Sequence, residues 1–161
     1  MDWQTKLDDR IDAWQEEIRY LGDEPMMKDV AQLYWKGLDI IRRMNDELEY
    51  LRDNITPATS RISAVPVGHS GSHSDPTADL AYRIDLLSRQ IDEVRSTNDC
   101  LAADIRWFIR YEITNQQLQD IYRMRVFDRL HYAEIASKTN YTEGYCRSVV
   151  SRYNNMTTVK W

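Results

Sequence analysis

The sequence predicts an all-α protein in which long amphipathic helices precede a group of short ones. Three observations support this fold class. Apolar residues recur at intervals of three and four over three long stretches, which is the spacing of one face of an α-helix. The 161 residues include only 5 Gly and 4 Pro, so few breaks are expected. Three of those four Pro lie in a single segment, residues 56–77.

The charge of the chain is unevenly distributed. The formal net charge of −5 would argue against nucleic acid as a partner if it were uniform. Residues 1–56 carry 8 basic and 14 acidic side chains, residues 57–120 carry 6 and 9, and residues 121–161 carry 7 and 3. The last segment is therefore basic, with a balance of +4, and follows an acidic scaffold. Any nucleic-acid binding is expected in that last segment.

Several functional classes are not expected from this sequence. No apolar run approaches the roughly 20 residues that cross a bilayer, and the first residues do not resemble a secretion signal. Cys100 and Cys146 lack any paired spacing, so we expect reduced packing residues in a cytoplasmic protein. A glycine-rich phosphate loop, an HExxH motif and a nucleophile elbow are all missing. We therefore expect no membrane partner, no cofactor, no metal and no enzymatic activity.

Residues 1–55 are expected to form an antiparallel helical hairpin. The first apolar stripe comprises Trp3, Leu7, Ile11, Trp14, Ile18 and Leu21. Gly22 and Pro25 interrupt it, and a second stripe runs at heptad spacing from Met27 to Ile55. Gly37 fills one seam position of that stripe, where a close approach of two helices would explain a residue without a side chain. The short connection between the stripes favours helices that fold back on each other.

Residues 56–77 are predicted to be a flexible linker. The segment is rich in Ser, Gly, Thr and Pro, and it offers too little apolar surface to offset the entropy of ordering it. His69 and His73 within it are expected to be solvated linker residues, since no acidic or Cys ligands accompany them. Thr77 or Asp79 is the expected cap of the helix that follows.

Residues 78–112 are expected to form a long heptad helix. Its apolar seam runs from Leu80 to Phe108 and contains one polar residue, Asn98. Two interpretations of Asn98 stay open: it fixes the register or the oligomeric state, or it faces water where the bundle thins. The seam itself has two candidate partners, the N-terminal hairpin and the same helix of a second copy.

Residues 113–161 are expected to form a domain of short helices with the spacing of a helix-turn-helix. Ala136 is a small residue where two helices cross, and Asn140, four positions later, tolerates a positive φ in the turn. Thr142 is a good N-cap for the last helix, and Cys146 faces the preceding one.

The opposite face of the last helix is polar and basic, and it fits the major groove of double-stranded DNA. The expected base-contacting residues are Tyr145, Arg147 and Ser148. The expected phosphate partners are Lys138, Ser151 and Arg152. Thr142 and Glu143, at the start of the helix, complete the set of expected DNA-binding residues.

The segment IYRMRVFDRLHYAEIASKTNYTEGYCRSVVSRYNNM resembles region 4 of sigma-70-type factors. The matching residues are Arg125, Glu134, Ile135, Ala136, Thr142, Cys146 and Arg147. More of the chain resembles the sigma-like regulators of phages and prophages of Gram-positive bacteria, the ArpU/RinA type. These combine a Ser/Gly-rich linker ending near SDPTA, a long heptad helix and a terminal sigma-like helix-turn-helix. Here the departures are Asn140 in place of the usual Gly, Cys146 in place of the usual Val, and Gly144 inside the last helix.

This resemblance implies a transcriptional regulator in the cytoplasm of a bacterial host, often an activator of late phage genes that acts with host RNA polymerase. We expect a homodimer formed through the heptad helices. Nothing resembles the −10 recognition region, so a complete sigma factor is not expected. One alternative is a DNA-packaging protein similar to small terminase subunits. Another is a protein-binding module that grips RNA polymerase or an anti-sigma protein without contacting DNA.

Overall fold

The computed structural model describes the backbone of residues 2–62 and 76–158, and the side chains of the same ranges except residues 56–62. Within these ranges the chain forms α-helices and no strand, so the predicted all-α class is confirmed. The helices are α1 (Trp3–Arg19), α2 (Met27–Ile62), α3 (Pro76–Glu112), α4 (Gln116–Val126), α5 (Tyr132–Thr139) and α6 (Glu143–Asn154). None of the helices in these ranges is long and apolar enough to span a membrane.

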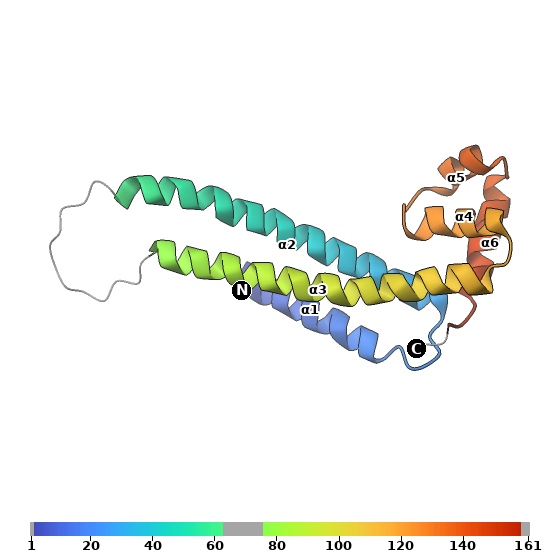
Figure 1. The fold of residues 1–161 in the computed structure, drawn as a ribbon, viewed down its shortest axis with the longest axis horizontal. Helices are drawn as coiled ribbons and strands as arrows, with labels where there is room; N and C mark the ends of the chain where they lie inside the picture. The colour runs from blue at the N-terminus through green and yellow to red at the C-terminus, as the bar shows by residue number, and fades with distance from the viewer. Residues whose placement is uncertain (1, 63–75, 159–161) are drawn as a thin grey trace.

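Helices α1, α2 and α3 form an elongated body, and α4, α5 and α6 form a C-terminal three-helix unit at one end of it (Figure 1). α2 and α3 lie side by side and antiparallel along most of the body, and α1 runs antiparallel to α2 along part of their length. The chain reverses between α1 and α2 at Gly22, whose φ of +73° suits a residue without a Cβ.

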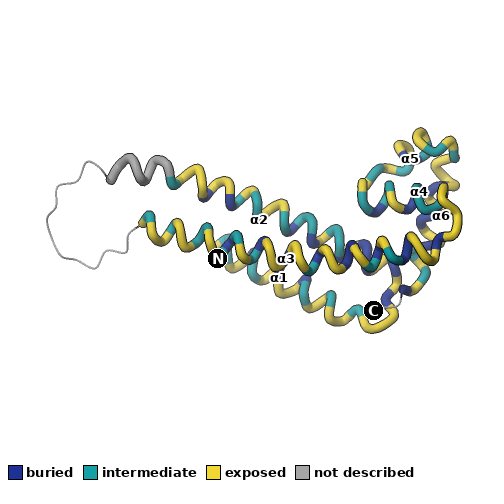
Figure 2. Tube along the Cα trace, viewed as in Figure 1, coloured by how far each residue is buried: buried dark blue, intermediate teal, exposed yellow. Residues whose placement is uncertain are grey.

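The three apolar stripes meet in the core of the body. The stripe residues that the structure describes are buried or half-buried, and the dark segments in Figure 2 follow the inner faces of the helices. Two partners were candidates for the apolar seam of α3: the N-terminal hairpin and a second copy of the chain. The seam packs against α2 of the same chain. The seam that was expected to join two copies is therefore filled within one chain.

Asn98 lies inside this seam and is only 2 % exposed. The interpretation that it faces water is therefore wrong. It packs where Gly37 lets α2 approach α3: a Cβ added at Gly37 would lie 2.7 Å from Cζ2 of Trp14 and closer still to the side-chain oxygen of Asn98. That oxygen has no hydrogen-bond partner among the described residues. The glycine is thus required by a close approach of helices.

The helices flanking the expected linker are longer than predicted. α2 continues beyond Ile55 to Ile62, because extending an existing helix adds one hydrogen bond for each residue fixed. α3 begins at Pro76, so Thr77 and Asp79 lie in its first turn rather than ahead of it. Proline suits a first turn, and an acidic residue there interacts favourably with the helix dipole. Residues 63–75, with His69 and His73, lie outside the described residues.

The C-terminal three-helix unit is fixed to the body by contacts from both long helices. The indole Nε1 of Trp35, on α2, donates to the carbonyl of Val126 at the end of α4 at 2.7 Å. Phe108, on α3, packs against Tyr122 of α4 and Tyr153 of α6, with ring centroids 5.9 and 6.3 Å away. The unit therefore has a defined position relative to α2 and α3.

Candidate nucleic-acid interface

The connection between α5 and α6 is a tight turn stabilised by its own residues. Asn140 adopts a left-handed conformation, with φ 60° and ψ 16°, which Asn tolerates better than most residues. The Thr142 hydroxyl accepts a hydrogen bond from the backbone N–H of Tyr145 at 3.2 Å and so caps α6. Ile135 and Cys146 are fully buried where the two helices pack, and Ala136 is half-buried beside them.

The start of α5 is held by a second set of contacts. Arg125 donates to the carbonyl of Leu130 at 3.0 Å, which closes the loop after α4. The Glu134 carboxylate accepts from the backbone N–H of His131 at 2.9 Å, so this donor at the helix start is satisfied. Arg129, in the loop, has a positive φ of 53° and forms a 3.2 Å ion pair with Asp39 on α2. These local bonds orient α5, and through it α6.

The expected DNA-binding residues all lie on the exposed surface of α5, α6 and the turn between them. They are Lys138, Thr142, Glu143, Tyr145, Arg147, Ser148, Ser151 and Arg152. Some of these side chains have local partners. Thr142 is occupied as a cap, the Ser148 hydroxyl donates to the carbonyl of Gly144 at 3.0 Å, and Arg147 pairs with Glu143 at 3.0 Å.

Five of these residues lie on two different faces of α6. At 100° per residue, Tyr145, Ser148 and Arg152 fall on one side, and Arg147 and Ser151 fall on another. Tyr145 stacks on Tyr141 of the turn, with ring centroids 4.8 Å apart. We call the side with Tyr145, Ser148 and Arg152 the outer face of α6. Arg152 forms no ion pair with a described residue, so its guanidinium is open to a ligand.

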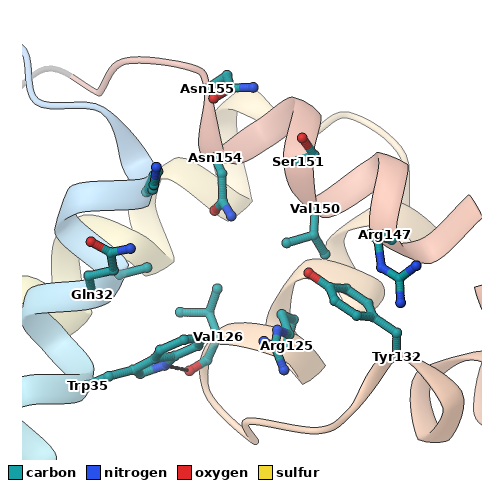
Figure 3. Close-up of a pocket in the computed structure, with 12 residues that line it drawn as sticks. Gln32, Trp35, Arg125, Val126, Tyr132, Arg147, Val150, Ser151, Asn154 and Asn155 are labelled. Carbon is teal, nitrogen blue, oxygen red and sulfur yellow. Dashed lines mark hydrogen bonds between the residues drawn. The ribbon is translucent and has the colours of Figure 1, made fainter. Parts of the chain in front are cut away.

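Arg147 and Ser151 instead line a cleft between α6 and α2, with a volume of about 350 Å³ (Figure 3). The cleft also contains Lys28, Trp35, Arg125 and Tyr132. We call it the α2–α6 cleft. The sequence predicts Arg147 as a base-contacting residue, but in the structure its side chain lines this cleft together with residues of α2. The spacing of Lys28 and Trp35, seven residues apart, is a signal that they share a helix face, but it does not indicate what that face meets.

The aromatic residues of the cleft hold its arginines in place. The Arg125 guanidinium lies between Trp35 and Tyr132, 5.4 and 4.7 Å from the ring centroids. Arg147 lies 5.2 Å from the centroid of Tyr132. Cation–π contacts orient a guanidinium without neutralising its charge, so these arginines stay able to bind an anion.

A buried tyrosine supports α6 from behind. Tyr122 is fully buried, and its hydroxyl donates to the Asn154 side chain at 2.9 Å. Burial raises the pKa of the Tyr122 hydroxyl well above its usual value, and the neighbouring Tyr132 adds a smaller upward effect. Tyr122 therefore stays a neutral donor in the folded protein at physiological pH.

The two cysteines differ in environment. Cys146 is buried between α5 and α6, as expected of a packing residue, whereas Cys100 is exposed on α3. Cys100 is therefore not a packing residue, because its position falls outside the buried stripe of α3. Among the described residues, His, Cys, Asp and Glu form no group of three that could hold a metal ion.

In comparisons with protein-family models, with curated proteins and with solved structures, nothing matches this chain.

Proposed function

We propose that this chain is a sequence-specific double-stranded DNA-binding protein that acts in transcription, with α5 and α6 as a helix-turn-helix. The observation that carries the proposal is the outer face of α6: Tyr145, Ser148 and Arg152 are exposed on a capped helix that follows a left-handed turn. An α-helix fits the major groove, and hydroxyl and guanidinium groups pair with base edges there. The resemblance to sigma-like regulators of the ArpU/RinA type supports the same proposal.

Charge supports assigning DNA to this end of the molecule. Residues 121–161 carry a balance of +4, although the whole chain carries −5. The acidic body repels phosphates, and the basic unit at its end attracts them. The protein is therefore expected to approach DNA end-on, with α1 and most of α2 and α3 directed away from the duplex.

The chain then fits a regulator that binds a promoter or operator and leaves its acidic body free for host RNA polymerase. A homodimer stays part of the proposal, but it needs a surface other than the α2–α3 seam, which is filled within the chain. Sizing of the protein on and off DNA distinguishes a dimer from the ring expected of a DNA-packaging protein.

The direct test is selection of binding sites from random duplexes by the purified full-length protein. A recovered common sequence supports the proposal. Arg152, expected from the sequence to contact phosphate, is reassigned to the bases because it shares the outer face with Ser148. Ser148→Ala and Arg152→Ala are therefore expected to relax the preference at single positions, each by about 1–3 kcal/mol of discrimination. Thr5→Ala, at an exposed position of α1, is a matched control that leaves the preference unchanged. Binding of RNA polymerase without any selection of DNA would instead favour the protein-binding module.

A further inference from the structure

We infer that the α2–α6 cleft is a phosphate clamp in which Lys28, on the body, and Arg147, on α6, each bind a phosphate of the same DNA strand from the two sides of the cleft. This inference rests on the proposed function and deepens it, because it gives the body a direct contact with DNA. It also moves Arg147 from the base-contacting residues to the phosphate-contacting ones.

The charges of the cleft indicate that it binds an anion. Lys28, Arg125 and Arg147 contribute three cationic groups, and the described lining residues include no Asp or Glu. Arg147 forms an ion pair with Glu143 at 3.0 Å, and Glu143 is not one of the residues that line the cleft. Both side chains of that pair are at least half exposed, so it contributes little to stability and exchanges readily for a phosphate.

The aromatic residues of the cleft determine what kind of anion fits there. Trp35 and Tyr132 could stack on a nucleobase, but guanidinium groups already lie over their rings. The Trp35 indole N–H is also used, in its bond to Val126. The aromatic rings of the cleft therefore bind its arginines, and the arginines present N–H donors. Such donors suit a phosphate rather than a nucleoside.

The position of the cleft, beside the outer face of α6, indicates that the anion is a DNA phosphate. Arg147 and Ser151 lie on the side of α6 that faces α2, adjacent to the outer face that is proposed to enter the groove. A helix lying in the major groove has a phosphate strand along its flank. On this flank the strand passes between α6 and the first turns of α2, where Lys28 lies. The position of the body, held by Trp35 and Phe108, thereby becomes part of DNA recognition.

The experiment measures the affinity of the full-length protein for a fluorescein-labelled duplex of arbitrary sequence as a function of salt. Such a duplex is suitable because phosphate contacts do not depend on sequence. Lys28→Ala and Arg147→Ala are each expected to weaken binding by roughly tenfold at ~50 mM salt and to lower the slope of log K against log salt by about one. The double variant is expected to lower the slope by about two if each cation displaces its own counterion.

Lys36→Ala is the matched control. Lys36 lies on the same helix, is also exposed, and pairs with Glu17 away from the cleft, so its removal is expected to leave the slope unchanged. Lys28→Gln provides a second variant, which removes the charge but keeps a polar side chain that suits a helix. Circular dichroism of each variant checks that the helices are intact. Since Lys28 is exposed, its substitution does not threaten folding.

The outcomes separate this inference from the proposed function. If the wild type binds the duplex and both Lys28 variants bind with an unchanged salt slope, the clamp is wrong and the proposed function stands. If the wild type binds no duplex, the proposed function fails together with the clamp. If inorganic phosphate protects the wild type against thermal unfolding and the Lys28 variants keep full DNA affinity, the cleft binds a free anion and the clamp is again wrong.

Discussion

At the scale of single residues, two glycines inside helices have opposite roles. Gly37 lies in the interior of α2 against Asn98 and Trp14, and no space is left for a Cβ. Gly144 lies in the first turns of α6, exposed, with no neighbouring atom within 4 Å of where a Cβ would be. The same residue type thus permits close packing at one position and only weakens the helix at the other.

Alanine substitutions test this difference. Gly37→Ala is expected to lower the free energy of unfolding by about 1–3 kcal/mol, because two buried side chains must move. Gly144→Ala is expected to raise it by about 0.5–1 kcal/mol, because the backbone entropy lost on folding falls. Urea unfolding followed by circular dichroism measures both. A stabilising Gly37→Ala would contradict the close approach of α2 and α3 at Gly37.

Tyr122 makes stability depend on pH in the alkaline range. Burial raises the pKa of its hydroxyl above the usual value of 10.0, so the folded state binds this proton more tightly than the unfolded state does. Its contribution to stability is therefore complete below about pH 10 and is lost as the pH rises above that value. We expect the free energy of unfolding to fall more steeply above pH 10 in the wild type than in Tyr122→Phe.

Tyr122→Phe also removes the hydrogen bond to Asn154, which is expected to cost about 1 kcal/mol at neutral pH. Tyr82→Phe is the control, since Tyr82 is exposed on α3 and its loss is expected to change neither quantity. Urea unfolding at several pH values gives the comparison. Equal alkaline slopes in the wild type and in Tyr122→Phe would show that Tyr122 does not remain protonated in the folded protein.

At the scale of elements, the turn between α5 and α6 determines how α6 is presented. Asn140→Gly is expected to be neutral or slightly stabilising, because Gly adopts the left-handed conformation freely. Asn140→Val is expected to cost about 1–2 kcal/mol and to weaken DNA binding in parallel, because a β-branched residue is strained there. Ala133→Val, on the exposed side of α5, is the control. Thermal unfolding and a duplex binding titration measure the two effects.

The elements also show which features a sequence can predict. The α5–α6 turn depends on Asn140 and Thr142, and those residues act on neighbouring backbone, so local sequence was enough to place it. The apolar stripes of α1, α2 and α3 were visible for the same reason, because helical periodicity repeats within each segment. The ends of α2 and α3 were missed, since composition suggested a linker where both helices continue.

The α2–α6 cleft could not be predicted from the sequence. Its walls come from residues far apart in the chain: Trp35 and Val126, joined by a hydrogen bond, are separated by 91 positions. No periodicity connects such residues, and only packing of the whole chain brings them together. The division of α6 into an outer face and a cleft side follows from the same packing, and it changes the role assigned to Arg147.

At the scale of the whole molecule, an acidic rod holds a basic unit at one end (Figure 1). The contacts of Trp35 with Val126 and of Phe108 with Tyr122 fix this unit to the rod, so the outer face of α6 has a defined direction. The proposed function needs this separation of charge, because phosphates are repelled by the body and attracted by its end.

Charge reversal on α6 tests that central claim most directly. The measurement is the affinity of the full-length protein for a labelled duplex. The α6 variant combines Arg147→Glu and Arg152→Glu. The control variant combines Arg89→Glu and Arg95→Glu, both on α3. Both double variants change the net charge equally, and all four arginines are exposed. We predict that the α6 variant loses at least about a hundredfold in affinity at ~100 mM salt, and that the α3 variant changes much less. Equal losses in the two variants, or undiminished binding by the α6 variant, would contradict the account.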